Sequence, residues 1–528
     1  MKIIIIIIGF LTFFYLNLGA QTFEMVKDIN PSGNSFTLNF QNENDIVNYN
    51  GKLYFRATDG ANGQELWVTD GTASGTSLVK DIYPMSGSFP TNFTEYNDKL
   101  YFRASDGVNG TELWVTDGTA SGTSLVKDIY DKGSSLVESF TEYNGKLYFS
   151  ASDGINGREL WVTDGTSSGT SLLKDINPMG SSFPYDYTEY NGRLYFRASD
   201  RTNKPELWVT DGTTAGTSLL NYINPTGYSS PSNPIEFNGN LYFQGNDGVN
   251  GKELMVTDGT ASGTSIVKDI NPTGSSSPEL FTEYNDKLYF RATDGVNGTE
   301  LWVTDGTLSG TSLLKDINTT GSSSPEFFTE YNGKLYFQAT DGINGTELWV
   351  TDGTTAGTSL VKDIDPSGSS NPLYLTEYHD KLYFKANNEL WKTDGTTAGT
   401  QKVQPDIAPN SSPLSGCYKL IKYDGSLYFA ANYNSNGNEL WKLTTKSLSV
   451  NGLPSIDFSI YPNPTNGLLE IESSEKISSI HILDATGREM IHIAKPTLQL
   501  NVTHLPSGLY FFQIFTQKGM ATKIFIKQ

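Results

Sequence analysis

The chain has 528 residues, a formal net charge of −21 and one cysteine, Cys417. A single cysteine excludes an internal disulfide bond, and the acidic balance argues against nucleic acid or an anionic membrane as a partner. Length alone suggests roughly three or four domains, although a repeat can join one long stretch into a single body.

Residues 1–20, MKIIIIIIGFLTFFYLNLGA, combine one lysine, an apolar run and a small final residue. This pattern is typical of a secretory signal peptide cleaved near Ala20. No cysteine lies near that position to accept a lipid, and no later segment has the roughly 18 consecutive apolar residues of a spanning helix. We therefore expect an exported, soluble mature protein without a transmembrane segment.

Residues 21–445 repeat one motif, of which ELWVTDGTASGTSLVKDI, beginning at Glu65, is a copy. The eight tryptophans mark successive copies, and Met255 occupies a ninth place. The spacing is 47 residues from Trp67 to Trp349 and then 42 and 50 residues. A period of this size indicates a solenoid, a propeller or another array.

One repeat, from Phe93 to Ile129, contains four β-rich runs: FTEYN, KLYFRA, ELWVT and TSLVKDI. Asn-Asp, DGVNG and DGTASG separate them, and such turns connect antiparallel strands. Four strands joined by tight hairpins form a propeller blade. Large side chains alternate on both faces of KLYFRA, so we expect neighbouring blades to cover both faces, with Trp114 between them.

The two ends of the array complement each other. Met25 to Ile29 reads as a fourth strand without its first three, and Glu439 to Leu443 reads as a third strand without its fourth. Their pairing would complete the last blade and remove its free edge. The predicted fold is all-β: a propeller of about nine four-stranded blades, closed by the N-terminal strand, and a small C-terminal β-sandwich. An open β-array of the same units is the alternative.

The period ends after residue 445, and residues 446–456 are expected to form a linker. Residues 457–528 alternate short strands with Pro, Asn and Gly turns and carry YPNPTNG, LDATGRE, LPSGLYFFQI and the terminal KIFIKQ. On these motifs the segment resembles the type A C-terminal sorting domain of the type IX secretion system of Bacteroidota. The resemblance implies the type IX machinery as partner, passage across the outer membrane, and cargo that is released or held on the cell surface.

On its ELWVTDGT copies, the array from about Phe23 to Thr445 resembles the ELWxxDGT repeat family of exported bacterial proteins. The family implies no activity. The TDGT element, as at Thr116 to Thr119, is expected to be structural, because Asp and Thr side chains bond nearby backbone N–H groups in turns.

The DGxNG element with its following glutamate offers oxygen ligands around two glycines, a combination that suits calcium as a possible cofactor. Turn chemistry alone also explains Asp-Gly and Asn-Gly. The fourth copy, SDRTNKPELW, and the eighth, KANNELW, depart from the pattern. The candidate metal ligands are Asp59, Asn62, Glu65, Asp106, Asn109, Glu112, Asp153, Asn156, Glu159, Asp294, Asn297, Glu300, Asp341, Asn344 and Glu347.

No catalytic residue is predicted, because no nucleophile elbow, zinc motif, phosphate loop or dinucleotide fingerprint occurs. His379 reads as an exposed turn residue, and Cys417 as a small apolar filler. The leading hypothesis is a surface or secreted binding or adhesion protein whose repeated loops and aromatic side chains meet an extracellular glycan or protein. A polysaccharide hydrolase or lyase, with acids and bases at a channel mouth where the repeats differ, and a structural surface component are the alternatives.

Overall fold

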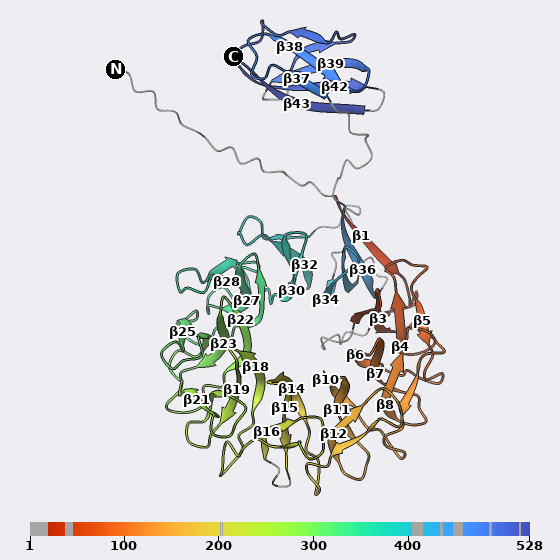
Figure 1. Ribbon diagram of the computed structural model, residues 1–528, viewed down its shortest axis with the longest axis vertical. Coiled ribbons are helices and arrows are strands. Elements are labelled where there is room, and N and C mark those ends of the chain that lie inside the picture. The colour runs from red at the N-terminus through yellow and green to blue at the C-terminus, as the bar shows by residue number, and fades with distance from the viewer. Residues whose placement is uncertain are drawn as a thin grey trace. The chain divides into compact units, whose positions relative to one another are not determined.

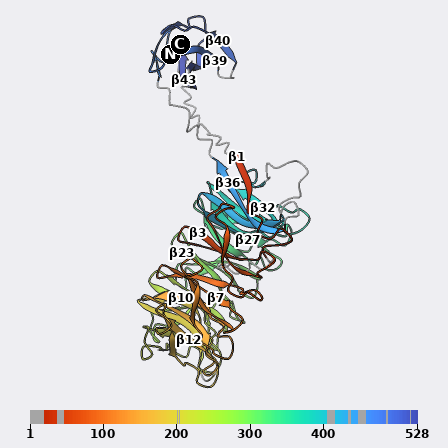
Figure 2. The same cartoon turned by 90° about the vertical axis from the view of Figure 1, so that its right-hand side faces the viewer.

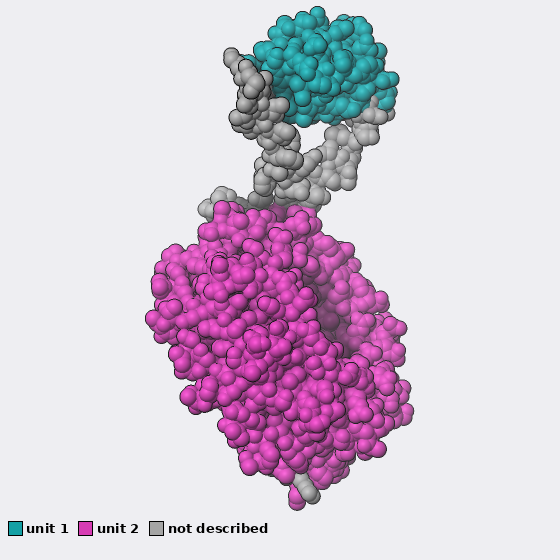
Figure 3. All heavy atoms as spheres, turned by 60° about the vertical axis from the view of Figure 1, so that its left-hand side comes forward, with its two compact units in different colours: residues 1–20, 446–528 teal, residues 21–445 magenta. Residues whose placement is uncertain are grey.

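The computed structural model describes residues 20–36, 46–200, 202, 204–403, 415–432, 437–446, 458–484, 488–516 and 519–528. These residues form strands and no helix, which confirms the all-β prediction for them. They divide into a repeat array, Gln21–Thr445, and a C-terminal unit that includes Lys446–Gln528 (Figure 3). The predicted signal peptide before Ala20 and nearly all of the predicted linker, from residue 447 on, lie outside the described residues.

In the part of the array that is described, four antiparallel strands form a sheet nine times. The first strands are β2 (Ile46–Tyr49), β6 (Thr91–Tyr96), β10 (Glu138–Tyr143), β14 (Tyr185–Tyr190), β18 (Ser232–Phe237), β22 (Glu279–Tyr284), β26 (Glu326–Tyr331), β30 (Leu373–Tyr378) and β34 (Ser415–Tyr423). The second strands are β3 (Lys52–Ala57), β7 (Lys99–Ser105), β11 (Lys146–Ser152), β15 (Arg193–Ser199), β19 (Asn240–Asn246), β23 (Lys287–Thr293), β27 (Lys334–Thr340), β31 (Lys381–Ala386) and β35 (Ser426–Asn432).

The third strands carry the Glu-Leu-Trp motif, or Glu-Leu-Met in β20. They are β4 (Glu65–Thr69), β8 (Thr111–Thr116), β12 (Arg158–Thr163), β16 (Pro205–Thr210), β20 (Lys252–Thr257), β24 (Thr299–Thr304), β28 (Thr346–Thr351), β32 (Glu389–Thr393) and β36 (Asn438–Lys446). The fourth strands are β5 (Ser77–Lys80), β9 (Ser124–Lys127), β13 (Ser171–Lys174), β17 (Ser218–Leu219), β21 (Ser265–Lys268), β25 (Ser312–Lys315), β29 (Ser359–Lys362), β33 (Gln401–Lys402) and, for the last sheet, β1 (Ala20–Lys27).

The sheets succeed one another around a common centre, with the first strands innermost and the fourth strands outermost (Figure 1). The local sequence explains each sheet. Asn97 and Asp98 connect β6 to β7 with φ values of 49° and 56°, the positive pair that a tight hairpin turn needs. Gly118, in the turn after β8, has φ of 92°, and a Cβ there would lie 2.2 Å from the hydroxyl of Tyr54 in the preceding sheet. Only glycine fits that approach.

Apolar side chains fill the space between successive sheets. Trp114, 6% exposed, packs in one cluster with Tyr54 and Val68 of the preceding sheet and Phe102 of its own sheet. The predicted position of the tryptophan between sheets is therefore confirmed there. The same kind of cluster joins the last sheet to the first, where Tyr428 packs with Trp67 and other residues.

The N-terminal strand β1 lies beside β36, so the last sheet has the order β1-β36-β35-β34. Figure 1 shows β1 along the outer edge of that sheet. Beyond β1, the backbone N–H of Ile29 donates a 3.1 Å hydrogen bond to Glu439 in β36. The pairing that the two ends of the sequence predict is confirmed.

The C-terminal unit contains two sheets around one core. One has the order β37 (Phe458–Tyr461), β38 (Leu468–Ser473), β41 (Gln499–Asn501). The other has the order β40 (Glu489–Ile493), β39 (Ile477–Asp484), β42 (Gly508–Thr516), β43 (Gly519–Lys527). Ile480, Phe512 and Phe525 are fully buried between them, as the predicted small β-sandwich requires. Figure 2 shows this unit from the side.

Candidate functional site

The Asp and Asn residues of the DGxNG loops bond to each other. Oδ1 of Asp106 accepts hydrogen bonds from the backbone N–H groups of Val108 and Asn109, at 2.9 and 2.7 Å, and Oδ2 accepts one from Asn109 Nδ2 at 2.7 Å. Partial burial opposes ionisation, but these bonds outweigh it and lower the pKa of Asp106. The same arrangement joins Asp59–Asn62, Asp153–Asn156, Asp294–Asn297 and Asp341–Asn344.

The glutamates that follow these loops turn inward. Glu112 is fully buried in β8 and accepts hydrogen bonds from the backbone N–H groups of Ile129, at 3.0 Å, and Ser135, at 2.8 Å. Burial raises the pKa of Glu112 to about 7. The carboxylate thus holds the connection to the next sheet, and Glu65, Glu159, Glu300 and Glu347 do the same.

The predicted calcium ligands therefore divide into an Asp-Asn pair on the loop and a glutamate inside the sheet. Among the described residues, no group of three or more His, Cys, Asp or Glu is arranged to hold a metal ion. Calcium binding at these loops stays a prediction, and it requires Asp106 to exchange its hydrogen bonds for the ion. The tip residue Val108 is 86% exposed, and Ile155, Val249, Val296 and Ile343 are equally exposed.

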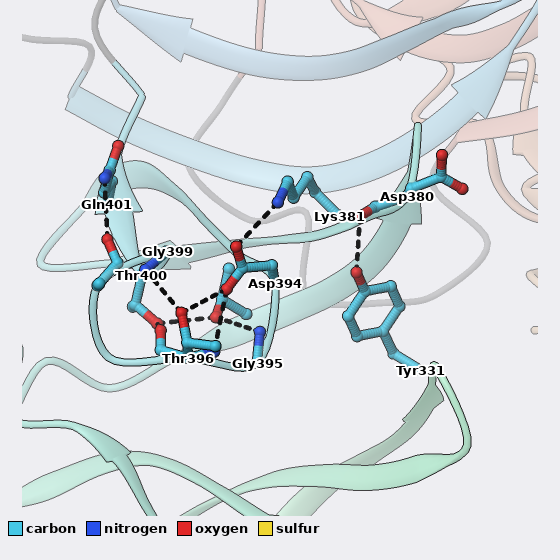
Figure 4. Close-up of polar contacts among 11 residues, drawn as sticks. Tyr331, Asp380, Lys381, Asp394, Gly395, Thr396, Gly399, Thr400 and Gln401 are labelled. Carbon is cyan, nitrogen blue, oxygen red and sulfur yellow. Dashed lines mark hydrogen bonds and ion pairs between the residues drawn. The ribbon is translucent and has the colours of Figure 1, made fainter. Parts of the chain in front are cut away.

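The TDGT turns are structural, as expected. In the eighth sheet, Asp394 Oδ1 accepts hydrogen bonds from the N–H and hydroxyl of Thr396, at 3.0 and 2.7 Å, and Asp394 Oδ2 pairs with Lys381 at 3.0 Å (Figure 4). The same view shows Tyr331 of the preceding sheet bonded to the carbonyl of Asp380. His379 is exposed beside this contact, which confirms its predicted place in a turn. The side chain of Cys417 lies outside the described residues.

One place differs in its side chains among seven of the nine sheets. In these sheets the first residue of the first strand pairs with the residue that follows Leu-Tyr-Phe in the second strand. We call these two residues the entry pair. The entry pairs are Thr91–Arg103, Glu138–Ser150, Tyr185–Arg197, Ser232–Gln244, Glu279–Arg291, Glu326–Gln338 and Leu373–Lys385. The register shifts directly after each of these pairs, and the next residue has positive φ, as at Ser139 with 58°. The backbone geometry repeats while the side chains differ.

Two cavities lie at the entry pairs of the second, third and fourth sheets. The first has a volume of about 570 Å³ and is lined by residues that include Phe89, Arg103 and Glu138. Nη1 of Arg103 lies 3.0 Å from Oε1 of Glu138, and Nη1 of Arg158 lies 2.7 Å from Oε2. Both oxygens of this carboxylate are therefore occupied. Phe89 is 54% exposed, and serine replaces this phenylalanine at the same place in three later repeats, as Ser230, Ser277 and Ser324.

The second cavity, of about 480 Å³, shares Glu138 with the first and adds Ser150, Phe183, Tyr185 and Arg197. The guanidinium of Arg197 lies over the ring of Tyr185, 4.7 Å from its centroid. Its Nε and the hydroxyl of Ser150 are buried and have no hydrogen-bond partner among the described residues. Sequence reasoning missed both cavities, although the unequal residues after Leu-Tyr-Phe were a signal that could have located them.

The arginine at the corresponding place two sheets further along the chain is neutralised. Arg291 forms ion pairs with Glu279 of its own sheet, at 2.7 Å, and with Glu326 of the next sheet. These contacts raise the pKa of Arg291, although burial opposes them. The hydrolase hypothesis predicts acidic and basic side chains where the repeats differ. At this entry pair the acidic and basic side chains form ion pairs with each other.

Comparison with known proteins identifies the C-terminal unit. Residues 459–528 match the family model described as the secretion system C-terminal sorting domain. None of the curated proteins matches the chain. No helix in the described residues is long and apolar enough to cross a membrane.

Several solved structures are similar to the chain. PorZ, a surface component of the type IX secretion system of Porphyromonas gingivalis, is 14% identical, with 92% of this chain and 75% of that chain covered and a TM-score of 0.34. The extracellular domain of BT4673 from B. thetaiotaomicron is 11% identical over 91% and 74% of the two chains, with a TM-score of 0.34. A puromycin-hydrolyzing peptidase of Mycobacterium tuberculosis is 12% identical over 66% and 59%, with a TM-score of 0.35.

The sorting domain implies recognition by the type IX secretion machinery. Residues 459–528 form a type IX secretion C-terminal sorting domain, and the protein is secreted to the cell surface or the extracellular space.

Proposed function

We propose that the repeat array is a propeller of nine four-stranded blades, closed by β1, in a protein of the ELWxxDGT repeat family from Bacteroidota. The four-stranded sheets, the pairing of β1 with β36 and the apolar cluster between the last and first sheets support this reading. A signal peptide at residues 1–20, a linker at residues 446–456 and a sorting domain from Asp457 complete the proposed organisation.

We infer that this array is a binding or adhesion module for an extracellular glycan or protein. One observation carries the inference: the side chains differ from sheet to sheet where the entry pairs line two adjoining cavities, while the turns, the tryptophans and the buried glutamates recur in most copies. A purely structural array has no need for half-exposed aromatic residues there. Phe89 and Phe183 are 54% and 55% exposed, and aromatic faces suit contact with sugar rings or apolar side chains.

The test uses the mature chain, Gln21 to Gln528, on a panel of extracellular glycans and matrix proteins, first with calcium and then with a chelator. The test variant is the double substitution Phe89→Ser and Phe183→Ser. Serine is chosen because Ser230, Ser277 and Ser324 occupy the same place in other repeats. Saturable binding that the double variant loses supports the proposal. Absence of binding to every member would refute it and direct attention to turnover of polysaccharides or to self-association. Loss of binding in chelator would assign calcium a role.

A further inference from the structure

We propose that the cavity around Arg197 binds the carboxylate of an acidic sugar unit in an extracellular glycan. The inference rests on the proposed binding function and adds the chemical class of the ligand. It starts from two buried polar groups that have no hydrogen-bond partner among the described residues, the Nε of Arg197 and the hydroxyl of Ser150. Both residues line the same cavity.

The positive charge of Arg197 favours an anionic ligand. No ion pair joins this guanidinium to a carboxylate in the described part of the chain, and the guanidinium lies over the ring of Tyr185. Asp186 interacts with it electrostatically, without an ion pair. Glu138 lines the same cavity, but Arg103 and Arg158 occupy both of its oxygens. A partly buried guanidinium is stabilised by an oxyanion that accepts two parallel hydrogen bonds.

The buried serine adds a second polar contact. Ser150 is 2% exposed and stands where neighbouring repeats carry Arg103 or Arg197. A hydroxyl that is buried without a partner costs free energy, and a ligand hydroxyl or carboxylate oxygen removes that cost. Ser139 and Ser199 place further hydroxyl groups in the lining of the cavity.

The aromatic lining favours a sugar over an acidic peptide. Phe183 is 55% exposed and lines the cavity, and the ring of Tyr185 lies under the guanidinium. A sugar ring presents an apolar face to such rings and hydroxyl groups to the serines, which matches the mixed lining. The volume, about 480 Å³, lies within the range of about 300 to 1,000 Å³ that is usual for small-ligand sites.

Arg291 supplies an internal contrast. It occupies the same place in the repeat as Arg197, but two glutamates pair with it. Gln244 and Gln338 occupy that place in two other repeats, so the fold accommodates glutamine there. Arg197→Gln and Arg291→Gln are therefore matched variants, one at an arginine without an ion pair and the other at a paired arginine.

The experiment is isothermal titration calorimetry of the mature chain with trigalacturonate. We expect saturable binding, weakened about tenfold or more by Arg197→Gln and changed less than about threefold by Arg291→Gln, since hydrogen bonds between two charged groups are stronger than those between neutral groups. The methyl ester of the same sugar should bind about tenfold more weakly. Circular dichroism checks the fold of each variant, and Arg197→Lys, which keeps the charge but not the fork of donors, serves if the glutamine variant does not fold.

Other outcomes overturn the inference in distinguishable ways. Binding of a neutral glycan that Arg197→Gln leaves unchanged would retain the proposed binding function and reject the carboxylate site. Binding of a hexaglutamate peptide or a sulfated oligosaccharide, with no binding of trigalacturonate, would reject the acidic sugar as ligand. No binding of these probes or of the wider panel would reject both the site and the function.

Discussion

The hydroxyl of Tyr423 in β34 donates a 2.6 Å hydrogen bond to the carbonyl of Gly51, which lies 372 residues earlier in the chain. The same bond joins consecutive sheets elsewhere, as between Tyr96 and Gly145 at 2.8 Å. At one junction it is missing, because Phe237 has no hydroxyl. The hydrogen bond that links consecutive sheets at the other junctions therefore also links the last sheet to the first.

Replacement of Tyr423 by Phe should lower the free energy of unfolding by about 0.5–1.5 kcal/mol, because the carbonyl of Gly51 loses its partly buried hydrogen bond. The reciprocal change, Phe237→Tyr, adds a hydroxyl donor at the junction that lacks one and should raise the free energy of unfolding. Urea denaturation of both variants measures the two effects. Opposite signs are expected, and a loss of stability in both would show that the hydroxyl has no room at Phe237.

Removal of residues 21–29 should destabilise the last sheet more than a single core substitution does. Phe23 and Val26 are 8% and 2% exposed, so at least about 3 kcal/mol of apolar burial is lost, and Glu439 loses the N–H of Ile29. Limited proteolysis should then cut in β36, which has become an edge. A synthetic peptide of residues 21–29 should restore protection, whereas a scrambled peptide should not. Unchanged protection in the truncated chain would contradict the pairing.

Replacement of Trp114 by Ala should cost about 3–5 kcal/mol, because the side chain fills the space between two sheets. Replacement by Met should cost less than replacement by Ala, because Met keeps part of the buried apolar volume. Met255 fills the corresponding place at 3% exposure, and the indole N–H of Trp114 has no hydrogen-bond partner among the described residues. Thermal unfolding of the two variants gives the comparison, and equal losses would show that the shape of the indole is required.

Stability should fall as the pH rises from 5 to 8. The pKa of Glu112 is about 7 in the folded protein, raised by burial above its ordinary value of 4.5. Between these two values the folded state binds more protons than the unfolded state, so the free energy of unfolding decreases with pH. Glu159, Glu206 and Glu439 share the shift to about 7.

The variant Glu112→Gln removes one of these titrating groups. It is expected to be less stable than the wild type, because an amide cannot accept both backbone N–H groups, but its disadvantage should shrink as the pH rises. Denaturation midpoints at pH 5, 6, 7 and 8 test this, with the exposed Glu95→Gln as control. Parallel pH profiles for Glu112→Gln and the wild type would contradict the buried, shifted carboxyl.

The repeat made the local fold predictable. Asn97 and Asp98 predicted a hairpin turn, and the repeated tryptophan predicted that Trp114 packs between sheets. The incomplete first and last repeats predicted the pairing of β1 with β36. Each of these follows from short-range geometry or from a pattern that recurs every 47 residues.

The candidate site could not be read in the same way. Glu112 reads as a loop ligand, but its position in the third strand places it inside the sheet, where the next connection supplies two N–H donors. Arg197 and Glu138 lie 59 positions apart in the sequence and come together only because adjacent sheets bring their entry pairs to one cavity. The pattern located the unequal residues without revealing which of them pair.

The positive φ after each entry pair has a consequence for how such a protein can change. At Ser139, Asp186 and Leu280 the same backbone conformation carries a hydroxyl, a carboxylate and an aliphatic chain. The fold tolerates this variety, because the turns, the tryptophans and the buried glutamates that stabilise it lie elsewhere in the repeat. Single substitutions at these places can therefore change the side chain that one sheet presents, one sheet at a time, while the scaffold stays the same.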